Sequence, residues 1–218
     1  MVPIPKIPSP IGFNDLRPIS MSTLWSKLME SYVVSYTMLE TSNHWKNNQC
    51  GGKRGSSTDY VLVSLWDNIL SNLDDPDNFA TTLVGVDISK SFSRCSFQDV
   101  MAAYRDLNAL QWRIDMRNAF LTNRRMQVKV GNILSDPILV TGGVVQGSIL
   151  GVLDHNAVLE NNDSDFMQPT SKYVDDMTLV ENTTHSAPSI VDFNDTLGKE
   201  CHTFQAKLTQ RTMGNKRP

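Results

Sequence analysis

The sequence lacks the cysteine patterns of disulfide-stabilised and zinc-binding proteins. Its three cysteines, Cys50, Cys95 and Cys201, are far apart and form no Cys-x-x-Cys pair. This spacing excludes a disulfide framework and a zinc site, and it favours a reducing compartment. A signal sequence and a membrane span are also missing, because prolines interrupt the N-terminal MVPIPKIPSPIG and no apolar run is long enough. We expect a cytoplasmic or nuclear protein with no membrane partner.

An excess of positive charge is missing as well. The formal net charge is −3 at pH 7, which argues against a protein that simply coats nucleic acid. Residues 112–131 depart from this balance, and their basic side chains are Arg113, Arg117, Arg124, Arg125 and Lys129. Such a basic stripe suits contact with phosphates, and a solvated helix face explains the same pattern.

The apolar residues predict a mixed order of helices and strands. Helical spacing predicts helices over residues 21–40, 60–73, 97–107 and 190–208, and a further helical segment that runs to about residue 121. The glycine-rich residues 141–151 are expected to lead into another helix, which continues through VLDHNAVLE at 152–160. Ser57, Thr58 or Asp59 is the expected cap of the second helix, and a Ser96–Asp99 capping box begins the third. Residues 81–89 are predicted to form a strand, and residues 126–140 a hairpin that turns at Gly131 and Asn132. Without strict βαβ regularity, the order indicates an α+β fold.

Three aspartates lie in or beside apolar, β-branched runs. Asp87 ends the run TTLVGVDIS, and Asp175 and Asp176 lie side by side in SKYVDDMTLVE. If the two strands are neighbours, the carboxylates converge, and only a cation would offset their repulsion. Hard oxygen ligands select Mg²⁺ or Mn²⁺, and two such ions held by aspartates are a common device for phosphoryl transfer. We expect YVDDMTLV to form a hairpin, with the paired aspartates at its tight bend, where both can approach one site. The simpler interpretation is that the Asp-Asp pair caps a turn.

Several segments together resemble the reverse transcriptases of retroelements. YVDD resembles their catalytic box, VGVDISKSFSR resembles LDFSKAFDR, and GGVVQGSILG resembles GVPQGSILGP. LRPIS and QCGGKRGSSTD resemble the YRPISL and QFGFRKGRST of non-LTR retrotransposons, and FLTNRRMQVKVG is similar to FLSDRxQRVxVG. VPIPK matches the strand that precedes these segments. The segments follow the family's order over roughly residues 2–182.

The resemblance implies an α+β fold with a polymerase palm, which is a ferredoxin-like antiparallel sheet backed by helices, and a fingers subdomain. The reverse transcriptase domain would cover residues 1–182, with fingers at 1–80 and 126–141 and palm at 81–125 and 142–182. Residues 183–218 would hold a partial palm helix and an eroded basic tail. We expect no thumb, RNase H or endonuclease segment.

The resemblance also implies the site residues. Asp87, Asp175 and Asp176, with the backbone carbonyl of Ile88, would bind two Mg²⁺ or Mn²⁺ ions. Phe92, five residues after Asp87, would lie under the sugar of the incoming nucleotide and exclude a 2′-hydroxyl. Simple core packing is the alternative for Phe92.

The resemblance also implies a role in nucleotide binding for four further residues: Lys6, Arg17, Gln146 and Gly147. Lys6 and Arg17 would hold the triphosphate, although either alone is more typical of a surface charge. Gln146 and Gly147 would contact the nucleotide and the template, and Tyr173 would support the site or the primer end. The expected partners are an RNA or DNA template with its primer, and deoxynucleoside triphosphates.

The sequence departs from the family pattern at several positions. Ser93 replaces a frequent acidic residue, Val145 replaces a proline, and DHNAVLE at 154–160 replaces an apolar helix, at an expected cost in core stability. A truncated, inactive remnant that binds nucleic acid through residues 112–131 is therefore the alternative to an active polymerase. An RNA-templated RNA polymerase is disfavoured by Phe92, and NNDSD at 161–165 is a polar loop or, alternatively, a calcium site.

Overall fold

The computed structural model describes residues 1–88, 90–161, 171–184 and 206–214. The chain forms two compact units, one of residues 1–45 and 92–161 and one of residues 46–91 and 162–218. The NNDSD segment, predicted to be a polar loop or alternatively a calcium site, lies outside the described residues apart from Asn161. The part of the predicted helix from 190 to 205 lies outside them as well. Among the described helices, none combines the length and the apolar character needed to cross a membrane.

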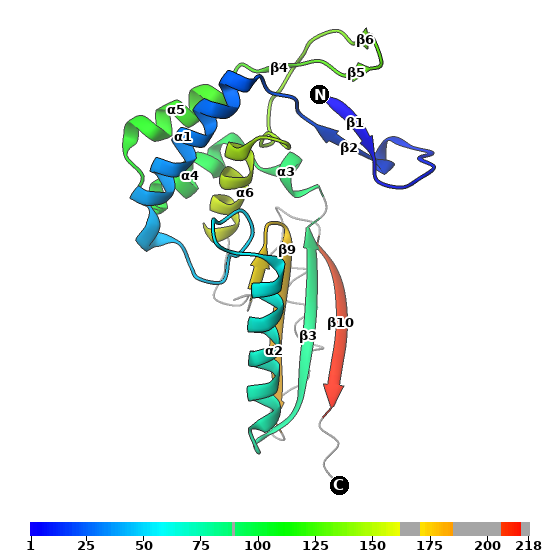
Figure 1. The fold of residues 1–218 in the computed structure, drawn as a ribbon, viewed down its shortest axis with the longest axis vertical. Helices are drawn as coiled ribbons and strands as arrows, with labels where there is room; N and C mark the ends of the chain where they lie inside the picture. The colour runs from blue at the N-terminus through cyan, green and yellow to red at the C-terminus, as the bar shows by residue number, and fades with distance from the viewer. Residues whose placement is uncertain (89, 162–170, 185–205, 215–218) are drawn as a thin grey trace. The chain divides into compact units, whose positions relative to one another are not determined.

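The first unit is mainly helical, with short strands at its edge (Figure 1). Its helices are α1 (Leu24–Glu40), α3 (Ser91–Arg94), α4 (Phe97–Asp106), α5 (Gln111–Leu121) and α6 (Ile149–Asn161), with short 3-10 turns η1 (Phe13–Asp15) and η2 (Ser42–His44). Its strands are β1 (Val2–Pro5), β2 (Leu16–Ile19), β4 (Arg125–Met126), β5 (Lys129–Val130), β6 (Ile133–Leu134) and β7 (Ile138–Leu139). Helix α6 packs against α4 and α1, and α4 packs against α5.

Local signals of the first unit act as predicted. The side chain of Ser96 accepts the amide of Asp99 at 3.0 Å, and the Asp99 carboxylate accepts the amide of Ser96, so the capping box of α4 is confirmed. The turn at Gly131 and Asn132 is confirmed too, because Val130 pairs with Ile133 and Gly131 has φ of 57°. The helical spacing of 21–40 predicted α1, although the apolar side chains of that pattern are exposed; they are Leu24, Leu28, Met29 and Tyr32.

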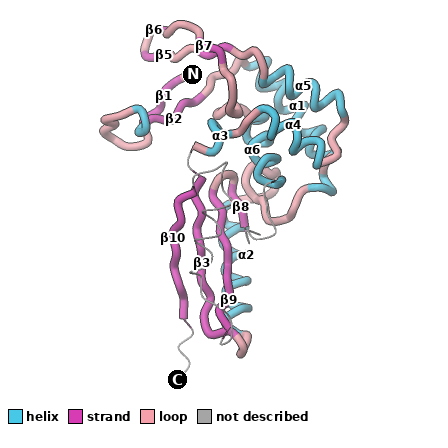
Figure 2. Tube along the Cα trace, turned by 180° about the vertical axis from the view of Figure 1, so that it is seen from behind, coloured by secondary structure: helices cyan, strands magenta, loops and turns pink. Residues whose placement is uncertain are grey.

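The second unit is a four-stranded antiparallel sheet with a helix on it. Helix α2 (Thr58–Asp74) begins at Ser57, whose hydroxyl accepts the amide of Tyr60 at 3.3 Å. The strands are β3 (Asn78–Ile88), β8 (Ser171–Tyr173), β9 (Asp176–Thr184) and β10 (Ala206–Gly214), in the order β10-β3-β9-β8. In chain order this is fourth, first, third, second, the order of a ferredoxin-like sheet. Helix α2 packs along β3, β8 and β9 (Figure 2).

Strand β10 shows that the end of the helix predicted over 190–208 is wrong. The helix predicted over 190–208 was expected to include Ala206 to Leu208, but these residues begin β10 and pair with Ile88 to Val86 of β3. An unpaired edge of β3 offers a full ladder of hydrogen bonds, and this tertiary partner outweighs the local helical spacing. The tail expected to be eroded therefore contributes a strand up to Gly214.

Buried pairs fix how β3 lies against β9. Val86 is directly opposite Met177, and Val84 is directly opposite Leu179. All four side chains are buried. Since directly opposite residues share one face of a sheet, these pairs set both the core face and the register of the two strands.

Candidate active site

The Asp175–Asp176 pair lies at a tight hairpin turn, as the sequence predicted. Tyr173 of β8 pairs with Asp176 of β9, so Val174 and Asp175 form the turn between them. Val174 has φ of 60°, a conformation that a β-branched residue rarely adopts and that costs roughly 1–3 kcal/mol. Asp175 is half-buried and Asp176 is exposed.

Asp87 lies directly opposite Asp176. The register of β3 and β9 pairs these two residues, one step beyond the buried pair Val86 and Met177. Because side chains alternate along a strand, the core pair directs positions 87 and 176 to the opposite face of the sheet. Asp176 in turn faces Tyr173 on β8, so positions 87, 176 and 173 form one row across three strands.

The structure describes the backbone of Asp87 but not its side chain. Among the described side chains, no group of three histidines, cysteines or acids is arranged to hold a metal ion. Ile88, the last residue of β3, has a buried side chain and pairs with Ala206. The positions of Asp87, Ile88, Asp175 and Asp176 thus come together at one end of the sheet.

A loop from early in the chain supports the hairpin turn. The Gln49 side-chain carbonyl accepts the amide of Val174 at 3.3 Å and the amide of Gly51 at 3.0 Å. Backbone hydrogen bonds join Lys172 to Asn48 at 2.7 Å and Cys50 to Lys172 at 2.8 Å. Gln49 and Lys172 are fully buried. The segment QCGG matched the family in sequence, but nothing in the sequence showed that it contacts the hairpin 125 residues later.

Lys6 and Arg17 lie together on the ribbon of β1 and β2. Ile4 is directly opposite Arg17, and Lys6 follows Ile4 by two residues, so Lys6 and Arg17 are on the same side of the ribbon. Both side chains are exposed, and the Lys6 ammonium donates to the carbonyl of Asn14 at 2.8 Å. The carboxylate of Asp15 lies near Lys6 and offsets part of the positive charge there.

Gln146 and Gly147 pack against the end of β2. The carbonyl of Gln146 accepts the amide of Ser20 at 2.8 Å, and Gly147 has φ of 100°. A Cβ atom on Gly147 would lie 2.8 Å from the Ser20 carbonyl oxygen, so both the conformation and the close approach require glycine. A cavity of about 480 Å³ opens beside this segment; its lining includes Ser20, Ser26, Glu30, Arg125 and Gln146.

Phe92 lies at the start of α3 and is half-buried. Its ring stacks on the ring of His155 from α6, with centroids 4.4 Å apart and planes 5° apart. The nine predicted site residues therefore fall into two sets. Asp87, Ile88, Asp175 and Asp176 belong to the sheet unit, and Lys6, Arg17, Phe92, Gln146 and Gly147 belong to the helical unit.

Comparison with known protein families gives the same family as the sequence motifs. The sequence profile of the family described as "Reverse transcriptase (RNA-dependent DNA polymerase)" matches residues 4–211. The chain belongs to the reverse transcriptase family. A relative from Drosophila melanogaster, "Probable RNA-directed DNA polymerase from transposon BS", is 28% identical over 139 residues, which are 63% of this chain and 15% of the relative.

Solved structures support the same fold. Telomerase from Candida tropicalis, in complex with the TWJ fragment of telomeric RNA, superposes with a TM-score of 0.65 at 11% identity, covering 86% of this chain and 34% of that one. Telomerase from Candida albicans, in a similar complex, superposes with a TM-score of 0.57 at 12% identity, covering 88% and 35%. At such identities the matches show the α+β fold alone. The chain spans about a third or less of the length of these relatives.

This reverse transcriptase-family chain carries an unusual buried polar cluster on α6. Asp154 and His155 are completely buried, and Glu160 is buried as well. The hydroxyl of Tyr104 donates to Asp154 Oδ1 at 2.8 Å, and the guanidinium of Arg117 lies 3.6 Å from the same oxygen. Burial raises the pKa of Asp154, and the charge of Arg117 and the hydrogen bond from Tyr104 oppose part of this rise. Tyr104 on α4 and Arg117 on α5 therefore offset part of the cost predicted for burying Asp154.

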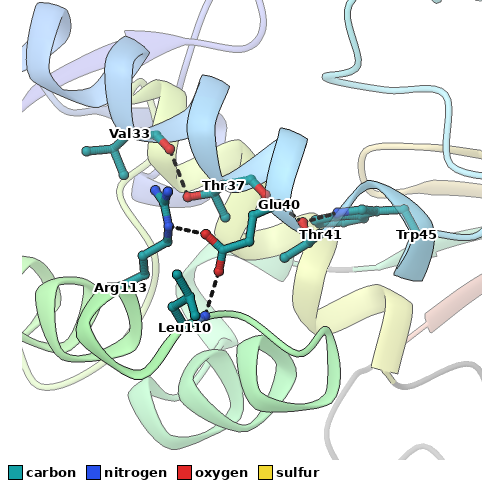
Figure 3. Close-up of polar contacts among 7 residues, drawn as sticks. All are labelled: Val33, Thr37, Glu40, Thr41, Trp45, Leu110 and Arg113. Carbon is teal, nitrogen blue, oxygen red and sulfur yellow. Dashed lines mark hydrogen bonds and ion pairs between the residues drawn. The ribbon is translucent and has the colours of Figure 1, made fainter.

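The first half of the basic stripe at residues 112–131 does not face solvent, so both interpretations drawn from the sequence are wrong for that half. Arg117 is 1% exposed, and Arg113 is buried in an ion pair with Glu40 of α1 (Figure 3). Glu40 also accepts the amide of Leu110 at 2.6 Å. The guanidinium of Arg124 donates to the carbonyls of Leu121 and Gly143. Within the stripe, Arg125 and Lys129 are the exposed cations among these described residues.

Glu30 is a further structural residue that the sequence did not reveal. It is 2% exposed on α1, accepts the hydroxyl of Ser26 at 3.0 Å, and accepts the amide of Ile149 at 3.0 Å. A carboxylate at the first amide of α6 interacts favourably with the positive end of the helix dipole. Glu30 thereby joins α1 to the segment that carries Gln146 and Gly147. The only signal in the sequence is an acidic residue among apolar ones, a pattern that solvent-exposed helix positions produce just as readily.

We expect Gly51→Ala to destabilise the hairpin turn. An added Cβ would lie 2.4 Å from the backbone nitrogen of Val174 and 2.9 Å from the carbonyl carbon of Tyr173. Because these are backbone atoms, relief requires the turn to shift, at a cost of about 2 kcal/mol in the free energy of unfolding. Chemical denaturation measures this change. Gly12→Ala, which adds a Cβ in open space, is the control and should change stability by less than about 0.5 kcal/mol; equal effects of the two variants would contradict the close approach.

We expect His155 to make stability fall with decreasing pH. Burial lowers the pKa of its imidazole from 6.5 to about 4, against a smaller opposing effect of Asn156. The unfolded chain therefore binds more protons between these two pH values, and the stability contributed by neutral His155 is present above pH 6.5 and is lost as the pH falls toward 4. Between pH 7 and pH 5 the loss is about 2 kcal/mol.

Chemical denaturation over this pH range, with His155→Phe as the comparison, measures that contribution. The phenylalanine variant lacks the titrating group, so its free energy of unfolding should fall less steeply with decreasing pH. An identical pH slope in the two proteins would contradict the burial of a neutral imidazole.

Proposed function

We propose that this chain is the catalytic part of an RNA-directed DNA polymerase of a retroelement. It would add deoxynucleotides to the 3′-hydroxyl of a primer paired with an RNA or DNA template. The observation that carries the proposal is the position of Asp87 directly opposite Asp176, with Asp175 in the adjoining turn. Membership of the reverse transcriptase family supports it. Because the chain spans only part of its relatives, the activity of those proteins is proposed here for this chain.

The residues at the end of the sheet fit a pair of divalent cations. Three carboxylates within one hairpin and its neighbouring strand repel each other in the absence of positive charge. All candidate ligands are hard oxygen atoms, namely the carboxylates of Asp87, Asp175 and Asp176 and the carbonyl of Ile88, and this set favours Mg²⁺ or Mn²⁺. When bound, two such ions would lower the pKa of the attacking primer hydroxyl and stabilise the leaving pyrophosphate.

Other residues would bind and select the nucleotide. Lys6 and Arg17 would hold the triphosphate, and their exposed position on one side of the β1–β2 ribbon supports this role. The ring of Phe92 would meet the sugar and exclude a 2′-hydroxyl. Gln146 would contact the nucleotide and the template.

We also propose the division into subdomains that the family implies. The fingers would comprise residues 1–80 and 126–141, and the palm residues 81–125 and 142–182. The strand order β10-β3-β9-β8 supports a palm sheet at β3, β8 and β9. The two compact units have other bounds, because α2 packs on the sheet while α4, α5 and α6 form a helical core with α1.

Primer extension tests this function directly. The full chain with a primed RNA template, deoxynucleoside triphosphates and Mg²⁺ or Mn²⁺ should extend the primer. Asp175→Asn/Asp176→Asn should lower the rate by about 10³-fold or more, because the ligands of the metal ions are lost. The matched control is Asp67→Asn/Asp74→Asn, which removes the same charge from the exposed surface of α2 and should keep the rate.

Each outcome has a distinct meaning. Extension by wild type and by the α2 control, with loss in the Asp175/Asp176 variant, supports the proposal. A wild-type chain that folds cooperatively and extends no primer would contradict the proposed activity and favour the inactive remnant. Equal loss in both double variants would contradict the assigned role of the hairpin aspartates.

A further inference from the structure

The stacked pair of Phe92 and His155 joins an accessible ring to an enclosed one. The ring centroids are 4.4 Å apart and the planes differ by 5°, so the two rings are parallel. Phe92 is half-buried, whereas His155 is 0% exposed. One side of the Phe92 ring therefore rests on a ring that is itself surrounded by the helical core.

Close packing around His155 restricts the motion of its ring. His155 lies in the middle of α6, between the buried residues Asp154 and Asn156. Asp154 is tied to Tyr104 on α4 and Arg117 on α5, and α6 packs directly on α4 and α1. In a core at normal packing density, a buried ring has little room to change rotamer. Burial also lowers its pKa to about 4, so the imidazole is uncharged at neutral pH.

The backbone of Phe92 is fixed independently of its side chain. Its carbonyl accepts the amide of Val144 at 2.8 Å, and the carbonyl of Cys95 accepts the amide of Gly143 at 2.8 Å. At Gly143, which has φ of 82°, a Cβ would lie 3.3 Å from the Phe92 carbonyl oxygen. The segments 92–95 and 143–144 are thus clamped together, and the main freedom left to Phe92 is rotation of its side chain. Contact with the flat face of His155 restricts that rotation.

We propose that His155 is a positioning residue that fixes the ring plane of Phe92 and so sharpens the rejection of ribonucleotides. This inference rests on the proposed function, in which the Phe92 ring meets the sugar. A flat ring at position 155 supports the whole face of Phe92. A branched aliphatic side chain offers an uneven surface on which the Phe92 ring tilts, and a tilted ring leaves room for a 2′-hydroxyl. His155 itself touches no substrate.

Sugar selectivity tests the proposal. Single-nucleotide incorporation by the full chain is compared for a deoxynucleotide and the matching ribonucleotide, and the ratio of the two kcat/KM values is the readout. His155→Phe keeps a flat ring and should keep the ratio within about two-fold, whereas His155→Leu should lower it about ten-fold, mainly through faster use of the ribonucleotide.

A control separates loss of the stack from general loosening of α6. Leu153 is buried and lies two residues before His155, on the other side of the helix. Leu153→Ala should lower stability and leave the selectivity ratio unchanged. Equal ratios for His155→Phe and His155→Leu, or an equal fall for Leu153→Ala, would overturn the inference.

A measurement without catalysis keeps this test distinct from that of the proposed function. The chain has four histidines, and the ring protons of His155 are identified in an NMR spectrum by their loss in His155→Phe. Stacking on Phe92 should shift these protons upfield, and Phe92→Leu should abolish the shift. If the wild-type chain extends no primer, the proposed function fails, and the NMR experiment alone tests whether His155 positions the Phe92 ring. His155 resonances that do not move in Phe92→Leu would show that the rings do not stack, and would overturn it.

Discussion

The register of β3 against β9 is the constraint on which the proposed chemistry depends. Val86 and Met177, and Val84 and Leu179, are directly opposite and buried, so they hold the two strands in one alignment. One step further along, the same alignment sets Asp87 opposite Asp176 on the other face of the sheet. A slip of one residue would exchange the core and solvent faces of a strand. The buried apolar pairs oppose such a slip, and they thereby keep Asp87 opposite Asp176.

The turn beside this pair has an unfavourable backbone that the rest of the unit must hold. Val174 lies in the left-handed region, where a β-branched residue is strained. Its amide donates a hydrogen bond to the side chain of Gln49, and the absence of a side chain at Gly51 allows the backbone of the turn to approach closely. The loop at 48–51 therefore supports the proposed active site, although it contributes none of the proposed ligands.

Features with a local cause could be predicted from the sequence, and those that depend on distant partners could not. The Ser96–Asp99 capping box, the turn at Gly131 and the hairpin at YVDD each need only residues close in the chain. Arg117 and Asp154 seemed to be a surface cation and a costly core acid until the fold paired them, and removing one member of such a buried pair costs about 3–5 kcal/mol. The start of β10 was predicted as helix because its pairing with β3 is not visible in local spacing.

Titration of the full chain with Mn²⁺, followed by the loss of the free-ion EPR signal, tests most directly whether the strand register assembles a metal site. The account predicts that wild type binds Mn²⁺, that Asp87→Asn and Asp176→Asn each weaken binding at least about 10-fold, and that Asp67→Asn on α2 does not. Loss of affinity on replacing Asp87, the partner from the neighbouring strand, is the decisive result. Unchanged Mn²⁺ binding in both Asp87→Asn and Asp176→Asn would contradict a shared site at the end of the sheet.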